Sequence, residues 1–543
     1  MNPFFELTLA VAVSMLVIPL VRRFAPRLGL VDMPDPRKVH TVPIPRVGGW
    51  GITLGSLVPV VLVVRPDPLT QSFLIGCVTL FAFGIWDDAR TIGHWTKFLG
   101  QLGAAGVVVY YGNLWVARVP LLDGALPLEL GKPFTIFALI GVINATNHSD
   151  GLDGLAGGES ILSLIALAVL GYMSGSTLVL SISLATIGGI LGFLRYNSHP
   201  AYVFMGDSGS QVLGFTLAFL VVYLTQTANT AVSAALPLLI LGLPIADILS
   251  VLYQRIRGRM NWFKATRNHV HHRLMHLGFN HCETVVIIYS IQAALVTTAI
   301  LARYEADTAV ALVYGTVVAT CFSTLALAER RAWRLQRGQG AWSRLTHTLV
   351  RLKMHTAVLK APLLVITALA PTMMLLSALM VTHIPTDLAV TAALLSAVPA
   401  VYLFWPRMVH PALLRLAIYA TAIIPAYLLI SYPEEFPQRA ESLTIALTVV
   451  LAAAMVLYVS LGAEQRFGTT PTDYLIVCGV VALLVFGSID VNSRSVIEAV
   501  LFATVLMYAC EIIVGTAAAS SSRRLLQCST LGTLLIITLR GVL

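Results

Sequence analysis

The chain has 543 residues, of which 57% are hydrophobic and 11% are charged, and its formal net charge at pH 7 is +9. Soluble domains carry roughly 25% charged residues, so this composition excludes an ordinary soluble protein and indicates one that crosses a membrane many times. A basic excess is also typical of nucleic-acid-binding proteins, but the distribution of the charge along the chain argues against that class.

The first apolar run, 4–21, has the acidic Glu6 near its start and Arg22, Arg23 and Arg27 directly after it. A secretory signal peptide carries its positive charge ahead of the apolar core. We therefore expect a retained transmembrane helix whose N-terminus lies outside.

Apolar runs of about 20 residues, each long enough to cross a bilayer, recur along the whole chain. We expect an all-α fold, a polytopic helical membrane protein whose broken or bent helices surround a cytoplasm-facing cleft. About eleven spans are expected in 1–328, near 4–21, 48–64, 70–86, 98–115, 133–146, 159–174, 177–194, 209–227, 232–252, 284–302 and 307–327. Six or seven more are expected near 361–380, 388–405, 412–431, 442–462, 473–489, 495–516 and 525–539.

The chain is expected to have three parts: a membrane-embedded core at 1–328, a basic linker at 329–360 and an additional transmembrane domain at 361–543. We interpret the linker as a cytoplasmic anchor that touches anionic lipid head groups, in preference to a partner-binding segment. The third part has no polar cluster that suggests a role, and Glu511 is its one candidate for an acid inside the membrane.

The basic charge lies mainly on one side of this topology. Alternating spans from an outside N-terminus place the loops 22–47, 87–97, 195–208 and 253–283 in the cytoplasm. Every Lys and Arg before residue 330 falls in those loops, with the exceptions of Arg65, Arg118, Lys132 and Arg303. This is the positive-inside pattern, so no nucleic acid partner is needed to explain the charge.

The segment after the fifth expected span carries the strongest site signal. Asn147, Asp150 and Asp153 follow one another at three-residue steps between two apolar runs. Residues three apart share a helix face, so the three side chains would point to one place if the helix continues. Carboxylates at a membrane boundary need water, a cation or a substrate as partner, and the pattern therefore predicts a site.

Four further polar clusters fall on the same, cytoplasmic side, which predicts a single active site there. Their members are Arg37, Lys38, His40 and Arg46; Asp87, Asp88 and Lys97; Asn197, Phe204 and Asp207; and Arg267, His269, His271 and His272. Carboxylates hold Mg²⁺, while Arg, Lys and His neutralise phosphate charge. The mixture therefore favours pyrophosphate chemistry, and no serine-hydrolase, zinc-protease or P-loop motif is present.

The five clusters resemble, in order, the motifs of the polyprenyl-phosphate N-acetylhexosamine-1-phosphate transferases, the glycosyltransferase 4 superfamily. The segment from Pro43 to Gly49, Pro-Ile-Pro-Arg-Val-Gly-Gly, is similar to the GlcNAc-type branch. The resemblance implies that 1–328 is a sugar-1-phosphate transferase core in the bacterial inner membrane. Its active site would face the cytoplasm, and a homodimer is left open.

The reaction implied by the resemblance is transfer of N-acetylhexosamine-1-phosphate, in the first place GlcNAc-1-phosphate, from a UDP-sugar to polyprenyl (undecaprenyl) phosphate. UMP is released and a cell-envelope glycan such as O-antigen is initiated. A phospho-MurNAc-pentapeptide or modified-hexosamine transferase is the alternative within the family. A transporter or lipid flippase is disfavoured because transporters place their coupling sites near the bilayer midplane, whereas these acids lie at span ends.

The resemblance also implies roles for the residues. Mg²⁺, or Mn²⁺ in its place, would be bound by Asp207 and Asp150, while Asp153 and Asn197 would contact the uracil and Phe204 would stack on it. The expected catalytic residues are Asp87, Asp88, Asp150, Asp153 and Lys97. The expected substrate-binding residues are Arg37, Lys38, His40, Arg46, Asn147, Asn197, Phe204, Arg267, His269, His271 and His272.

Asp87 and Asp88 diverge by about 100° on a helix, so they cannot share one role. The resemblance suggests one of them as the base that deprotonates the lipid phosphate. A phosphate monoester has a second pKa near 6 and is mostly ionised in the cytoplasm, so a base is hardly needed. Our hypothesis is that Asp87 orients the acceptor or a metal while Lys97 holds Asp88.

Some features leave alternatives open. Asp207 could be a helix N-cap, Phe204 could pack in the core, and His269, His271, His272 and His276 could form a zinc site, although phosphate or sugar recognition fits their Arg neighbours better. The chain departs from the family pattern at Thr91 and Thr266, where the family has acids, and at His148 and Ser149, where it often has aliphatic residues.

Overall fold

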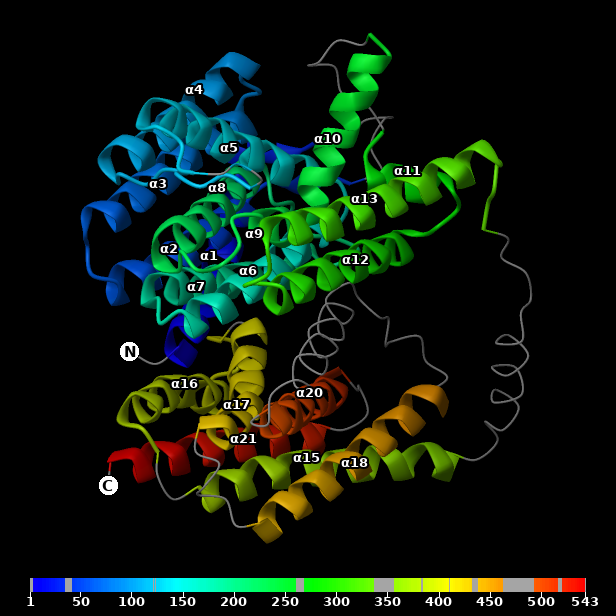
Figure 1. The fold of residues 1–543 in the computed structure, drawn as a ribbon. Coiled ribbons are helices and arrows are strands. Elements are labelled where there is room, and N and C mark those ends of the chain that lie inside the picture. The colour runs from blue at the N-terminus through cyan, green and yellow to red at the C-terminus, as the bar shows by residue number, and fades with distance from the viewer. Residues whose placement is uncertain are drawn as a thin grey trace. The chain divides into compact units, whose positions relative to one another are not determined.

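A computed structural model describes residues 3–34, 42–120, 122, 124–259, 268–335, 356–381, 384–409, 411–431, 438–461, 493–515 and 520–542. The described residues form two compact units, one of residues 6–335 and one built mainly from residue 356 onward (Figure 1). Each unit is a bundle of helices, and the strands described are two short ones in the first unit.

The first unit begins with α1 and ends with α13. Its elements are α1 (Pro3–Leu28), β1 (Val31–Asp32), β2 (Ile44–Pro45), α2 (Gly48–Val63), α3 (Pro68–Ala89), α4 (His94–Gly106), η1 (Val107–Tyr111), α5 (Leu128–Ser149), α6 (Leu155–Met173), α7 (Thr177–Asn197), α8 (Asp207–Tyr223), η2 (Leu224–Ala228), α9 (Leu236–Ile240), α10 (Gly242–Arg257), α11 (Val270–His276), α12 (His281–Leu301) and α13 (Asp307–Arg330).

The helical content and the length of the helices confirm the prediction of a polytopic membrane protein. In the described ranges, eleven helices are long and apolar enough to cross a membrane. The expected span at 232–252 is corrected, since α9 and α10 are separate helices that meet at Leu241. Pro244, the third residue of α10, has no backbone N–H to donate to the Ile240 carbonyl, so a continuous helix across Leu241 would lack this hydrogen bond.

α8 lies at the centre of the first unit. In the most apolar 18-residue stretch of the continuous helix Asp207–Ala228, 94% of the residues are buried inside the bundle, against 11% in the corresponding stretch of α13. Its first turn lies against Gly49 of α2 and Gly84 of α3, where a Cβ atom would collide with the backbone of Ser208. Glycine at these two positions lets three helices meet around the N-terminus of α8.

The end of the loop between α1 and α2 holds the segment that precedes α8. β1 pairs antiparallel with β2, and the Phe204 amide donates to the Pro45 carbonyl at 2.8 Å. The amides of Gly48 and Gly49 donate to the carbonyls of Phe204 and Met205 at 2.9 and 2.8 Å. The segment that leads into α8 is therefore tied to the start of α2.

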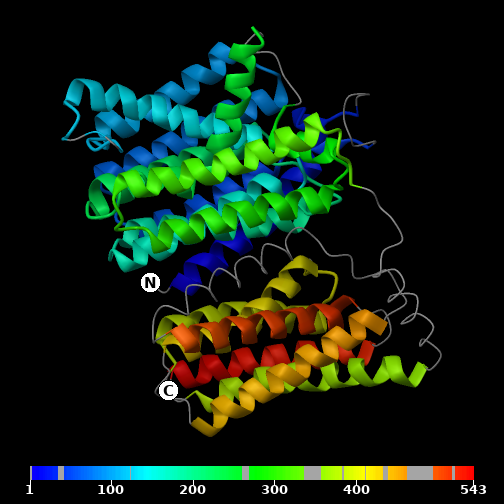
Figure 2. The ribbon, with the colours of Figure 1, turned by 45° about the vertical axis from the view of Figure 1, so that its right-hand side comes forward.

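The second unit is a bundle of apolar helices (Figure 2). Those described are α15 (Thr356–Met380), α16 (Thr386–Phe404), α17 (Pro411–Ser431), α18 (Gln438–Leu461), α20 (Ser493–Gly515) and α21 (Ser520–Val542). Arg540 of α21 donates to the carbonyls of Leu379 and Val381 at 2.7 Å, at the end of α15. The predicted span at 473–489 lies outside the described residues.

Candidate active site

Side chains from four helix ends meet at the start of α8. The Nζ atom of Lys97, from α4, lies 2.5 Å from Oδ2 of Asp87 on α3 and 2.5 Å from Oδ2 of Asp207 on α8. The amide of Asn147, at the end of α5, donates to Asp207 Oδ1 at 3.2 Å and to the Ser210 hydroxyl at 2.7 Å. Three of the predicted clusters are thus brought together.

Lys97 remains a cation in this position. Burial lowers the pKa of Lys97, but the carboxylates of Asp207 and Asp87 outweigh burial and hold that pKa above its ordinary value. One ammonium group therefore bridges two carboxylates. The expected pair of Lys97 with Asp88 is corrected, because the ion pairs of Lys97 are with Asp87 and Asp207.

Asp88 caps α8 from another helix. Its carboxylate accepts hydrogen bonds from the Asp207 amide at 2.8 Å, from the Ser208 amide at 3.1 Å and from the Ser208 hydroxyl at 2.7 Å. Gly206 precedes the helix with φ +75°, and a Cβ there would meet the Asp88 carboxylate. A negative group at a helix N-terminus is stabilising, so Asp88 holds α8 while Asp87 faces Lys97. Asp207 is not the N-cap residue, the alternative that the sequence left open, because Gly206 occupies the N-cap position and Asp207 is the first helical residue.

The helix does not continue from Asn147 to Asp153, which was the condition for the three side chains to share one face. α5 ends at Ser149, a turn follows, and Gly154, in the left-handed region at φ +80°, precedes α6. The physical reason is that glycine adopts a positive φ without steric cost, so the chain can leave the helix at this point. Asn147 consequently faces Asp207, whereas Asp153 points toward His199.

The turn exposes Asp150 to a negative field. Burial raises the pKa of Asp150 to about 7, and the charges of Asp207, Asp88 and Asp153 act in the same direction. Within the described ranges, no group donates a hydrogen bond to its carboxylate. A half-buried carboxylate without a donor, beside further carboxylates, fits a hard divalent cation with oxygen ligands such as Mg²⁺.

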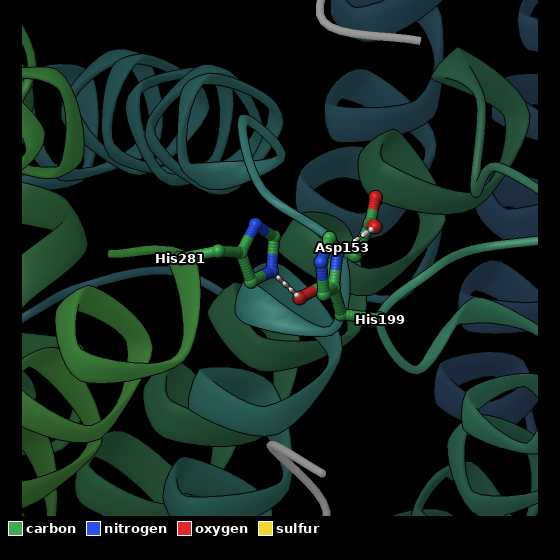
Figure 3. A group of neighbouring side chains, drawn as sticks. All are labelled: Asp153, His199 and His281. Atoms are coloured by element: carbon green, nitrogen blue, oxygen red, sulfur yellow. Dashed lines mark hydrogen bonds and ion pairs between the residues drawn. The ribbon is translucent and has the colours of Figure 1, made fainter. Parts of the chain in front are cut away.

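Asp153 is held by two histidines (Figure 3). Its Oδ2 atom lies 2.7 Å from Nδ1 of His199 and accepts from the Ala201 amide at 3.1 Å. Its backbone carbonyl lies 3.0 Å from Nε2 of His281. The two imidazole rings stack with centroids 4.0 Å apart.

Asn197 and Arg46 have partners within the chain. The Asn197 side chain accepts from the Gly154 amide at 2.8 Å and donates to the Val203 carbonyl at 2.9 Å, and the residue is 3% exposed. Arg46 forms an ion pair with the buried Asp32. Both residues shape the loops around the site.

Among the other residues predicted for the site, some lie within the described part of the chain and some do not. The backbone of Phe204 forms a parallel bridge with that of Arg46. The predicted residues Arg37, Lys38, His40 and Arg267 lie outside the described residues.

The histidine cluster rests on an aspartate of α10. Asp247, buried in that helix, lies 2.8 Å from Nδ1 of His269 through Oδ2 and accepts from the Val270 amide at 2.9 Å. The ring of His269 lies 5.3 Å from that of His148 and 5.8 Å from that of His271.

His271 connects the cluster to the turn after α5. Its imidazole occupies the space that a Cβ of Gly151 would need. Burial lowers the pKa of His271 to about 3, with repulsion from His272 and His269 adding to it and Asp247 opposing it. His271 is therefore neutral at pH 7. Its neighbour His272 lines an open groove of about 730 Å³ between α10, α11 and α13.

Sequence comparison places this arrangement among known proteins. The sequence model described as Glycosyl transferase family 4 matches residues 70–225. A relative from Bacillus subtilis (strain 168), named probable undecaprenyl-phosphate N-acetylglucosaminyl 1-phosphate transferase, is 36% identical over 51% of this chain and 78% of its own length. The undecaprenyl-phosphate alpha-N-acetylglucosaminyl 1-phosphate transferase of Haemophilus influenzae is 31% identical over 60% of this chain and 93% of its own.

The chain belongs to glycosyl transferase family 4. The resemblance inferred from the five motifs is confirmed, including its branch, since the relatives are GlcNAc-1-phosphate transferases by name. In this family 4 protein, the matched range 70–225 runs from α3 through α8 and so contains Asp87, Asp88, Asp150, Asp153 and Asp207.

Several residues at the site escaped the sequence analysis. Asp247 lies within an apolar run, where a single acid between Ala246 and Ile248 was the available signal. His199 lies two residues after Asn197 in a predicted cluster but was given no role, and His281 was not singled out; neither has the spacing of a metal-binding motif. Their proximity to Asp153 depends on contacts between residues 46 and 128 positions apart.

Proposed function

We propose that this protein transfers N-acetylhexosamine-1-phosphate, most simply GlcNAc-1-phosphate, from a UDP-sugar to polyprenyl phosphate and releases UMP. Undecaprenyl phosphate is the acceptor named for the relatives. The observation that carries the proposal is the ion-paired set Asp87–Lys97–Asp207 at the N-terminus of the buried helix α8. We place the site at the cytoplasmic face of the bacterial inner membrane, where the product would prime an envelope glycan.

The residues would act by positioning and by charge. The acceptor phosphate oxygen attacks the β-phosphorus of the UDP-sugar, a new pyrophosphate bond forms, and the bond to UMP breaks. Asp207 and Asp150 would hold Mg²⁺, which would neutralise charge on the diphosphate. Lys97 lies where it can pair with a phosphate oxygen in exchange for one of its carboxylates, and Asp88 keeps the start of α8 in place.

No proton transfer is required of Asp87 in this scheme. A phosphate monoester is largely a dianion near pH 7, so the attacking oxygen is already ionised. Asp87 also accepts a hydrogen bond from the Ile92 amide at 2.8 Å. This contact and the ion pair with Lys97 fix the carboxylate, which suits an orienting residue.

The test is UMP release by the purified full chain with UDP-GlcNAc, undecaprenyl phosphate and Mg²⁺. We expect activity in the wild type, loss in Asp207→Ala, and retention in Glu129→Gln, which changes an acid in the first turn of α5. Activity with another UDP-N-acetylhexosamine alone would correct the sugar. Absence of UMP with every UDP-sugar would contradict the proposal.

A further inference from the structure

Three potential metal ligands from three separate segments meet at Asp153 (Figure 3). Asp153 lies in the turn between α5 and α6, His199 follows α7, and His281 is the first residue of α12. One ligand atom from each lies within 4.8 Å of the other two. Among the described residues, this is the one group of three His, Cys, Asp or Glu side chains with that proximity.

The set differs in chemistry from the acidic centre at Asp207. Two imidazole nitrogens and one carboxylate oxygen suit Zn²⁺, Co²⁺ or Ni²⁺, whereas Mg²⁺ prefers oxygen ligands alone. The histidines that the sequence suggested for zinc do not form such a group, because His269 is held by Asp247 and His271 packs on Gly151.

We propose that Asp153, His199 and His281 bind one transition metal ion, with Zn²⁺ as the natural occupant. Three protein ligands with a fourth position for water is the pattern of an open zinc site. His199 is 41% exposed in its side chain and Asp153 20%, so the ion can enter from solvent. His281 reaches Asp153 from a different segment of the chain than His199 does, as Figure 3 shows.

Binding requires only local rearrangement. Ligand atoms at about 2.0–2.1 Å from a tetrahedral zinc ion must come closer than 4.8 Å to one another, and the stacked rings must turn so that their nitrogens converge. The ion would replace the contact of His199 with the Asp153 carboxylate and that of His281 with its carbonyl. The Ala201 amide can keep its bond to the carboxylate.

Such an ion would link the α5–α6 turn to α7 and α12. If the proposed function holds, it would also engage Asp153, which the family resemblance assigns to the nucleotide, and Zn²⁺ would then inhibit the transferase. The metal site itself does not depend on that function, since it can be measured without substrates.

The test is a Co²⁺ titration of the purified, tag-free full chain in detergent with excess Mg²⁺, followed by the visible absorption of tetrahedral Co²⁺. We expect one Co²⁺ per chain, displaced by Zn²⁺. His199→Gln and His281→Gln should each weaken binding by at least about tenfold, while His94→Gln, an exposed histidine in α4, should bind as the wild type does.

A second readout guards against misfolding of the variants. Zn²⁺ should raise the melting temperature of the wild type and of His94→Gln, because a ligand that binds only the folded state stabilises it. It should not raise that of His199→Gln, whose imidazole is partly exposed and whose loss leaves the bundle packed. A wild type without tetrahedral Co²⁺ absorption, or His199→Gln and His281→Gln variants that bind like the wild type, would overturn the proposal.

Discussion

Both units hold an ion pair among apolar helices, but the two differ in charge balance. In the second unit, Glu511 of α20 lies 3.3 Å from Arg415 of α17 and accepts a hydrogen bond from Tyr419. One anion there meets one cation. In the described part of the first unit, the one cation Lys97 forms ion pairs with both Asp87 and Asp207, and the carboxyl groups of Asp88 and Asp150 lie close enough to Asp207 to act on one another.

The comparison separates a structural pair from a reactive site. The Arg415–Glu511 pair is partly exposed, with 24% and 32% of the two side chains accessible, and its matched charges need no further ion. A set with more anions than cations needs a further cation, which a metal ion can supply. We therefore interpret the Glu511 pair as structural, whereas the acidic centre of the first unit is the site to which we assign the proposed reaction.

The largest expected effect comes from removing the cation of the unbalanced set. Lys97→Met should lower the rate of UMP release by about 10²–10³-fold, the usual cost of losing one electrostatic contact to a developing charge. The matched change Arg415→Met in the second unit should leave the rate within about twofold after correction for folded protein. Equal losses in the two variants would erase the distinction between the two pairs.

Asp87→Asn separates orientation from proton transfer. We expect a rate loss of about 10–100-fold, below the 10²–10⁴-fold that general acid–base catalysis supplies, and no change in the loss between about pH 6.5 and 8.5, because the attacking phosphate is ionised there. The measurement is the pH profile of UMP release. Recovery of the mutant's rate as pH rises would instead identify Asp87 as a base.

Asp88→Ala should destabilise the protein more than Asp87→Ala does. It removes three hydrogen bonds at the start of α8, and leaving buried amides unsatisfied costs about 1–3 kcal/mol. We expect a lower melting temperature in detergent for Asp88→Ala than for Asp87→Ala. The same melting temperature in the two variants would show that α8 does not depend on its cap from α3.

The smallest effect concerns His271 and pH. Its folded pKa of about 3 lies below the ordinary value of 6.5, so the unfolded chain binds more protons between these values and stability falls as pH drops below about 6.5. From pH 7 to pH 5 the loss is about 1–2 kcal/mol. His271→Gln should melt with a weaker pH dependence than the wild type, and an unchanged dependence would mean that His271 does not contribute.

The sequence predicted the spans and the convergence of distant clusters because both follow from local properties. Runs of apolar residues define helices, and alternation of spans places Asp87, Asn147 and Asp207 at one membrane face. It did not predict the turn at 150–154, since glycine tolerates helix and turn alike and the contact with His271 is remote in sequence. The partners of Asp88 and His269 were missed for the same reason: each depends on tertiary contacts more than 20 residues away.

The burial of α8 inside the bundle keeps this helix out of contact with lipid, which affects how the site responds to the membrane. Helices at the periphery, such as α13, adjust their tilt to bilayer thickness, but a helix enclosed by other helices has no lipid to follow. Asp207 is the first residue of that enclosed helix, whose first turn packs against Gly49 and Gly84. The outer helices can therefore change their tilt around a long lipid substrate or in a membrane of different composition. The carboxylate of Asp207 keeps its position, because the helix that carries it packs against other helices and not against lipid.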